Sequence, residues 1–474
     1  MTTSVQAGVP DASRPPGRGE RLRAALGRPI PAESLAAYRI LFGTLLFLST
    51  VRFMASGWIE VFYVQPAFHF KYYGFGWVKV LPEGGMWLLY GGIAASALLV
   101  ALGLFYRAAI AAFLGLFAYA ELTDVTNYLN HYYLVTLLAL LMTFLPMNAR
   151  GSLDARRRPD AARAQVPAWT LWLLRFQVGI VYVHAGLAKL GSDWLLHAQP
   201  LGIWLKARDE TPVLGPLFAL PETAYLFSWG GFLFDTTIVA WLLWKRTRPF
   251  AFAAVLVFHG LTQILFDIGI FPALMAINAT LFFEPDWPSR IAARLRRRAP
   301  PAPAPGSAVS RPPPRWAQGA LLAYAAFQVL FPFRHWLYPG DVLWNEQGMR
   351  WAWKVMLREK SGSVTYHVRD PRTGRSWQVS PSEYLTPRQE LEMSGQPDLI
   401  LQLAHHVAGD LRRKGHGEVE VRAEAKVSLN GRPSRLMIDP AVDLARVRDG
   451  LGAVRWILPG PTDLPLRANP TVSR

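Results

Sequence analysis

The feature that most constrains this sequence is a series of apolar blocks separated by short charged segments. Examples are Ile40 to Val51, Met86 to Phe105, Leu134 to Leu145 and Phe250 to Leu265. Blocks that approach about 20 residues are long enough to cross a bilayer as helices. Hydrophobic residues make up 51% of the chain and charged residues only 18%, a balance that is unusual for a soluble protein. The sequence therefore predicts an integral membrane protein.

We predict about nine spans, several of them shorter than a full crossing, and the pair around Asp267 has the alternative of one broken helix. The predicted spans are residues 34–54, 86–105, 108–123, 131–147, 169–190, 222–244, 250–266, 269–283 and 316–337. The resulting organisation is a polar N-terminus without a cleavable signal (1–33), a transmembrane helical domain (34–298), a proline-rich linker (299–315), a last transmembrane helix (316–338) and a C-terminal domain (339–474).

The positive charges predict the orientation of these spans. One set of loops, which includes the N-terminus, carries 21 lysines and arginines, whereas the alternate loops carry only Lys71, Lys79, Lys206 and Arg208. The N-terminus is therefore expected in the cytoplasm, and nine spans put the C-terminal domain outside it. Because the net charge of +17 is concentrated in these loops, we expect membrane lipid as a partner and no nucleic acid.

The region after the last span has the pattern of a mixed α/β domain. Ser363 to Arg369 and Glu418 to Glu424 alternate polar and apolar residues and are predicted strands. Pro387 to Arg412 has helical spacing of its leucines and valine. The predicted fold class is thus a polytopic α-helical membrane protein with a C-terminal extracytoplasmic α/β domain.

Lys189 is the most informative single residue, because it lies at the outer end of an otherwise apolar span. An ammonium group near hydrocarbon is costly, and burial favours the neutral amine, which can act as a base. With the predicted orientation, Asn130 and His131 begin another span at the same outer level. The alternatives are a lysine that snorkels to the headgroups and an asparagine that caps its helix beside an interfacial histidine.

The remaining polar residues of the spans are weaker candidates. His184 and His259 are each alone in an apolar helix, where a histidine is more often a packing residue. Asp193 and Trp194 mark the expected membrane interface. The histidines lack the spacing of known metal motifs, so we expect no metal site, and a chain without cysteine has neither disulfides nor thiolate ligands.

Several stretches together carry a resemblance to a known family. These are Asn130 to Leu134, Arg175 to Trp194, Phe258 to Phe271, and Ser428 to Arg432 followed by Asp439 to Asp443. On these residues the chain resembles vitamin K-dependent γ-glutamyl carboxylase and its bacterial relatives with a horizontally transferred transmembrane (HTTM) domain. The resemblance implies an enzyme of the bacterial inner membrane.

The resemblance also implies a chemistry and its residues. In the family, the lysine at the position of Lys189 deprotonates reduced vitamin K, oxygen adds to the quinol anion, and the vitamin becomes the epoxide. The strong base formed on the way removes the γ-proton of a protein glutamate, whose carbanion captures CO2. The resemblance implies that His131 assists oxygenation and that Asn130 supports it. Reduced vitamin K, O2 and CO2 are the implied cosubstrates, with a glutamate-containing protein or peptide as partner.

The same resemblance suggests residues that bind the substrates. Trp194 belongs to the lysine segment, and His259 matches a histidine of the later spans whose role is mainly structural. Trp353 lies in Met349 to Arg358, which corresponds to a family segment near the glutamate and quinone sites but lacks its tyrosine and histidine. Two alternatives therefore stand beside the carboxylase: a quinol epoxidase without carboxylation, and a non-catalytic membrane receptor or assembly factor.

Overall fold

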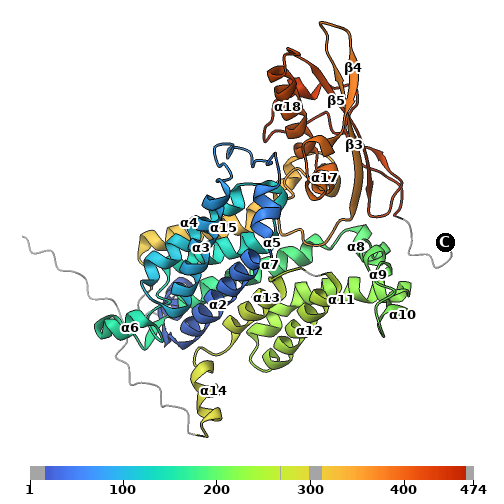
Figure 1. The fold of residues 1–474 in the computed structure, drawn as a ribbon. Helices are drawn as coiled ribbons and strands as arrows, with labels where there is room; N and C mark the ends of the chain where they lie inside the picture. The colour runs from blue at the N-terminus through green and yellow to red at the C-terminus, as the bar shows by residue number, and fades with distance from the viewer. Residues whose placement is uncertain (1–16, 267, 298–311, 466–474) are drawn as a thin grey trace, which may run out of the picture.

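The protein consists of a bundle of helices and a C-terminal domain built on a sheet (Figure 1). The computed structural model describes residues 17–266, 268–297 and 312–465. The helices that form the bundle are α2 (Glu33–Ala55), α3 (Glu83–Leu102), α4 (Tyr106–Leu122), α5 (Asn130–Phe144), α7 (Ala168–Ala188), α11 (Pro221–Leu243), α12 (Arg248–Phe266), α13 (Phe271–Ala279) and α15 (Arg315–Leu330). Short helices lie at its two ends: α1 (Arg18–Gly27), α6 (Leu153–Arg157), α8 (Ser192–His197), α9 (Leu201–Lys206), α10 (Gly215–Phe218) and α14 (Trp287–Leu295).

Six helices in the described part of the chain are long and apolar enough to cross a membrane. They are α2, α3, α7, α11, α12 and the continuous helical segment Arg315–Leu337, which includes α15. The other three predicted spans are also helical, but α4, α5 and the segment Phe271–Phe282 are shorter. The count of nine crossings is therefore not confirmed. Because α12 and α13 pack against each other, they form a helical hairpin rather than one broken helix.

The C-terminal domain contains a four-stranded antiparallel sheet in the order β4-β3-β5-β6. Its strands are β3 (Lys360–Arg369), β4 (Ser376–Val379), β5 (Glu420–Leu429) and β6 (Arg435–Leu436). Strands β3 and β5 pair along their whole length, from Lys360 opposite Leu429 to Arg369 opposite Glu420. Alternate β5 residues are buried against the domain's helices, as expected for a sheet with one solvated face.

The helical region of this domain differs from the sequence prediction. Instead of one helix over Pro387 to Arg412, the structure has α17 (Pro387–Ser394) and α18 (Pro397–Arg413). The break has a local cause, because a residue that precedes proline avoids the helical conformation and Pro397 itself has no amide proton. Gln396 accordingly has an extended backbone (φ −125°, ψ 106°). The strands are also longer than predicted, but both lie where expected.

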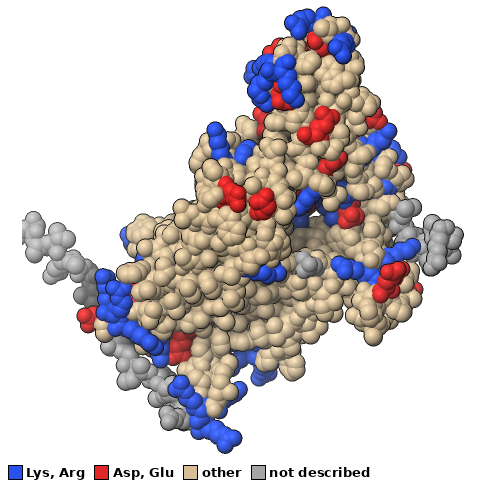
Figure 2. Space-filling model, in the orientation of Figure 1, with Lys and Arg blue, Asp and Glu red and all other residues tan. Residues whose placement is uncertain are grey.

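Charged side chains gather at the ends of the molecule rather than along its helical body (Figure 2). Arginine-bearing α6 and α14 lie at the end away from the C-terminal domain (Figure 1). The opposite end, where α8 and α9 lie, faces that domain. The predicted linker at 299–315 lies mostly outside the described residues. The arrangement is that of a membrane protein with a domain at one face.

Candidate active site

An apolar cavity of about 400 Å³ lies within the helical bundle, at the end that faces the C-terminal domain. Helices α7, α11, α12 and α13 form its walls, and Val355 and Met356 close it from the side of the C-terminal domain. Leu226 of α11 and Val257 of α12 line the cavity and are nevertheless 69% and 62% exposed. The cavity therefore reaches the apolar outer surface between these two helices, where lipid chains would lie.

The main charged groups of this cavity are Lys189 and Asp235, which form an ion pair. Lys189 follows the last residue of α7, and its Nζ lies 2.7 Å from Oδ2 of Asp235 on α11. Both side chains are buried, with 7% and 8% of their surface exposed. Nζ also donates to the carbonyl oxygen of Ala185, 3.3 Å away. Lys189 is thus held inside the protein and does not snorkel toward the headgroups.

Asp235 was not among the predicted site residues, although the sequence contained an indication of its importance. It is the only charged residue of α11 after Glu222, and a lone carboxylate in an apolar span needs a partner. The sequence does not show which helix supplies that partner. Lys189 and Asp235 are 46 residues apart and meet only because α7 and α11 pack side by side.

A glycine on α7 makes this meeting possible. A Cβ at Gly186 of α7 would lie 2.6 Å from Cγ2 of Thr236, so only glycine lets α7 approach α11 this closely. A Cβ at Gly231 would lie 3.9 Å from Cε of Lys189 and 3.6 Å from the ring of Trp194. These are ordinary contact distances, so a methyl group would also fit at Gly231. Gly186 therefore sets the geometry of the ion pair.

Trp194 forms a wall beside Lys189. Its ring centroid lies 5.1 Å from Nζ of Lys189, within the range of a cation–π interaction. Its indole Nε1 donates to the carbonyl oxygen of Ser228 at 2.8 Å, which fixes the ring against α11. The sequence analysis expected Trp194 at the membrane interface or the substrate site. The structure places it in the lining of the cavity, 5% exposed.

His259 of α12 lines the same cavity. Its Nε2 lies 3.1 Å from the hydroxyl of Tyr182, which is also part of the lining. Its Nδ1 is buried and has no hydrogen-bond partner among the described residues. His259 therefore offers a free ring nitrogen inside the protein. His184, the other lone histidine of the spans, packs against Phe333 and is not part of the cavity lining.

His131 lies behind one wall of the cavity rather than in its lining. Its ring packs on Phe271 (5.8 Å between centroids), and Phe271 in turn contacts His259 (5.4 Å) and lines the cavity. We expected Lys189 and His131 to face one cavity, and in this structure Phe271 lines it in place of His131. His131 is 8% exposed, and within the described residues its ring makes no hydrogen bond.

Asn130 faces a different space. Leu129, not Asn130, occupies the N-cap of α5 and makes no side-chain cap, so the capping alternative is wrong. The Asn130 Oδ1 accepts a hydrogen bond of 2.9 Å from the hydroxyl of Tyr128, and Asn130 lines a second cavity. Trp353 lines neither cavity, because its ring is buried and stacks on Tyr133 at 4.9 Å. Neither residue lies beside Lys189.

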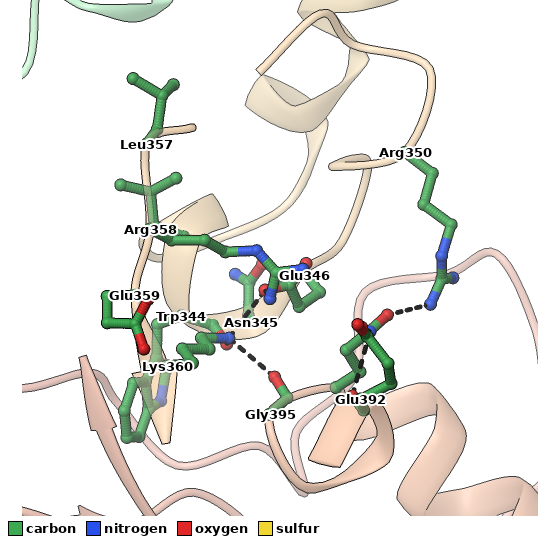
Figure 3. A network of polar contacts seen from close by, with 12 residues as sticks. Trp344, Asn345, Glu346, Arg350, Leu357, Arg358, Glu359, Lys360, Glu392 and Gly395 are labelled. Carbon is green, nitrogen blue, oxygen red and sulfur yellow. Dashed lines mark hydrogen bonds and ion pairs between the residues drawn. The ribbon is translucent and has the colours of Figure 1, made fainter. Parts of the chain in front are cut away.

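The second cavity, of about 640 Å³, lies between the helical bundle and the C-terminal domain. Its charged lining residues are Arg208, Glu346, Arg350, Lys354, Arg358 and Glu392. Figure 3 shows part of this network, with Glu346 beside Arg358 and Lys360. We call the two spaces the apolar cavity and the polar cavity. Leu265, Phe266, Ile268 and Met356 line both, so a thin apolar partition separates them.

The described residues contain no group of three or more histidines, aspartates and glutamates that could hold a metal ion. The ionisable side chains that line the apolar cavity are Lys189, Asp235, His259 and Tyr182.

Fold and site together define a polytopic helical membrane protein with a buried lysine–aspartate pair in a cavity open toward lipid, beneath a mixed α/β domain. Comparison with known families gives two matches: the HTTM domain over residues 27–287, and the lumenal domain of vitamin K-dependent γ-carboxylase over residues 314–463. The first match alone covers more than half of the chain. The chain belongs to the vitamin K-dependent γ-carboxylase family, and its C-terminal domain is the extracytoplasmic one. No solved structure matches it significantly.

Proposed function

We propose that this protein is a vitamin K-dependent γ-carboxylase-like enzyme of the bacterial inner membrane. It would oxygenate reduced vitamin K to the epoxide and couple this reaction to carboxylation of protein glutamate. The observation that carries the proposal is the Lys189–Asp235 pair, buried in an apolar cavity. A proton acceptor at the end of a cavity open toward lipid suits a lipid-soluble acid such as a quinol.

The residues of the apolar cavity fit a quinol. Aromatic and aliphatic side chains from α11 and α12 offer contacts to a ring and its hydrocarbon tail, and the opening beside Leu226 and Val257 gives a path from the bilayer. Polar groups are few and lie near the inner wall: Lys189, Asp235, Tyr182 and His259. These groups can orient two phenolic hydroxyls, whereas a polar substrate would leave most of the cavity wall without a partner.

Lys189 and Asp235 together accept the phenolic proton. The pair shares one ionisable proton between the amine of Lys189 and the carboxylate of Asp235, whose Nζ and Oδ2 atoms lie 2.7 Å apart. When that proton is on Asp235, Lys189 is a neutral amine and takes the quinol proton, which leaves the quinol anion beside an ammonium group. Asp235 thus keeps the pair neutral before the reaction and limits the cost of burying a charge. Addition of O2 to the quinol anion then forms the strong base that removes the γ-proton of glutamate.

Other residues of the chain protect and orient this chemistry. Trp194 lies against Lys189, and Met356 lines the cavity toward the C-terminal domain. Both side chains would help to exclude water, which would quench a strong base. His131 is proposed to assist oxygenation from behind Phe271, which a change of side-chain rotamer would move aside. Asn130 is proposed to act in the polar cavity, and Trp353 to hold the outer segment in place.

The proposal is tested with the purified full-length protein in lipid nanodiscs. Reduced vitamin K, labelled bicarbonate and a glutamate-rich peptide are supplied, and the epoxide and the labelled peptide are measured separately. Both products should form and both should disappear in Lys189→Ala. Gly260→Ala is the matched control, because a Cβ there meets no atom within 4 Å.

Formation of the epoxide without labelled peptide would favour a quinol epoxidase. The absence of both products, under conditions in which an animal carboxylase forms them, would contradict the enzyme proposal and favour a receptor or assembly factor.

A further inference from the structure

We infer that a third cavity, beside the start of α3, binds the headgroup of a phospholipid that carries an ammonium group. Lys71 and Lys79 hold its phosphate, and Glu83 holds its ammonium. The cavity has a volume of about 700 Å³ and shares no lining residue with the apolar or the polar cavity. We call it the headgroup cavity. Because its ligand is lipid, the inference does not depend on the proposed function.

The headgroup cavity lies beside the apolar surface of the bundle. It is lined by residues between 63 and 71, in the segment that joins α2 to α3, and by residues 79–83, of which Glu83 is the first residue of α3. About one turn further along α3, Trp87 and Leu88 are 41% and 78% exposed. Tryptophan is typical of the level at which headgroups lie. A headgroup in this cavity therefore has its acyl chains beside an apolar helix surface.

Lysines are rare on this face of the protein, and two of them meet in the headgroup cavity. The loops of the membrane region on this side carry four lysines and arginines, against 21 in the other set of loops, and two of the four line this cavity. Nζ of Lys71 donates to the carbonyl oxygen of Thr123 at 2.7 Å, which leaves two N–H groups for a ligand. The exposed side chain of Lys79 makes no hydrogen bond or ion pair with a described residue and can turn toward a phosphate.

The remaining lining residues complement a headgroup with both charges. Among the described residues that line the cavity, Glu83 is the one carboxylate, and it makes no ion pair with either lysine. Two cations and one carboxylate match a phosphate joined to an ammonium group. The rest of the wall is largely aliphatic, as the glycerol and the first carbons of the chains require. These wall residues are Val64, Pro66, Val80, Leu81 and Pro82.

The wall of the headgroup cavity also holds the C-terminal domain. The backbone N–H of Lys71 donates to Gln402 Oε1 of α18, and Gln402 Nε2 donates to the Lys71 carbonyl oxygen, both at 2.9 Å. Gln389 Nε2 of α17 donates to the carbonyl oxygen of Phe68 at 2.8 Å. A bound headgroup therefore orders the segment against which α17 and α18 dock, and lipid binding should stabilise this docking.

The inference is tested by lipid binding to the full-length protein. Phosphatidylethanolamine is titrated into the protein in detergent micelles, and native mass spectrometry measures the bound fraction. Lys79→Gln should weaken binding about fivefold, as expected for one lysine near a phosphate. Lys79→Arg keeps the charge and should bind as the wild type does. Lys206→Gln is the matched control, because it removes an exposed lysine of the same face that does not line the cavity.

The role of Glu83 is tested by comparing two headgroups. The wild type should bind phosphatidylethanolamine several-fold more tightly than phosphatidylglycerol, which has the phosphate but no ammonium. Glu83→Gln should lose this preference while it still binds both lipids. Hydrogen exchange at residues 66–71 should slow when phosphatidylethanolamine is added to the wild type, and it should slow less in Lys79→Gln.

Three results would overturn the inference. The first is unchanged lipid affinity in Lys79→Gln, or an equal loss in Lys206→Gln, because the lysines of the cavity would then have no special role. The second is a wild type that does not prefer phosphatidylethanolamine, because Glu83 would then hold no ammonium group. The third is displacement of the lipid by millimolar inorganic phosphate, which would identify the cavity as a site for a soluble anion.

Discussion

Arg432 of the C-terminal domain forms a bidentate ion pair with Asp193, which lies four residues after Lys189. NH1 lies 2.6 Å from Oδ2 and NH2 lies 2.6 Å from Oδ1. Asn430 donates to the same Oδ2 at 2.8 Å. The segment that carries the buried lysine is therefore tied to the extracytoplasmic domain. Two stretches that resemble the family at opposite ends of the sequence meet at this contact.

Arg432→Gln should loosen the contact between the two parts of the protein. Because both side chains are largely buried (10% and 15% exposed), removing one partner should cost about 3 kcal/mol of docking stability. Hydrogen exchange at residues 428–432 and 191–195 measures the effect. Arg435→Gln is the control, since its pair with Asp463 is about half exposed and should contribute less than about 1 kcal/mol. Equal exchange in the two variants would show that the contact is incidental.

The same contact should depend on pH only in acid. Burial raises the pKa of Asp193, but hydrogen bonds from Arg432 and Asn430 lower it more, so that it lies below the ordinary value of 3.8. A depressed carboxyl pKa stabilises the folded form above the unfolded value, and this stability is lost as the pH falls through the folded value. Docking should therefore be constant near neutrality and weaken only below about pH 4. Asp193→Asn should lack this acid-dependent step in hydrogen exchange; a step that persists would assign it to another group.

Gly186→Ala should separate α7 from α11. The new methyl group would overlap Thr236, and overpacking of this kind costs about 1–3 kcal/mol. The Lys189–Asp235 distance should increase, with a loss of both thermal stability and epoxide formation. Gly260→Ala meets no atom and should leave both unchanged. If Gly186→Ala behaves like this control, close helix packing does not set the geometry of the pair.

Glu346→Gln should destabilise the C-terminal domain near the polar cavity. The glutamate side chain is 5% exposed and pairs with both Arg358 and Lys360, so its loss leaves the buried Lys360 and the partly buried Arg358 without this carboxylate. The expected cost is about 3–5 kcal/mol in the free energy of unfolding. Chemical denaturation followed by tryptophan fluorescence measures it. Glu424→Gln, which removes an exposed pair with Lys426, should cost under about 1 kcal/mol. Similar midpoints for the two variants would contradict a structural role for Glu346.

Much of the fold was predictable because membrane helices and strands have local signatures. All nine predicted spans are helices, and the two predicted strands pair with each other. The number of crossings was harder to predict, because α4, α5 and α13 are apolar but short, and their burial depends on neighbours that the sequence does not reveal. Pro397 indicated a break between α17 and α18, but the helical spacing of the leucines favoured one continuous helix.

The candidate site was predictable only in part. Lys189 and Trp194 were found because polar and aromatic residues at the end of an apolar run are conspicuous. Asp235 was not, because its partner is set by how α7 and α11 pack. His131 was expected beside Lys189 from its depth alone, but depth does not specify the direction of a side chain, and Phe271 lines the cavity in its place.

Chemical rescue of Lys189→Ala by small primary amines tests the central claim most directly. The variant should form epoxide at least about a hundredfold more slowly than the wild type, as expected for the loss of a general base. Methylamine or ethylamine, small enough for the vacated space, should restore part of the rate, and more basic amines should restore more. Rescue by amines would identify the missing function as proton transfer. An undiminished rate in Lys189→Ala, or a lost rate that no amine restores while quinol binding is intact, would contradict the account.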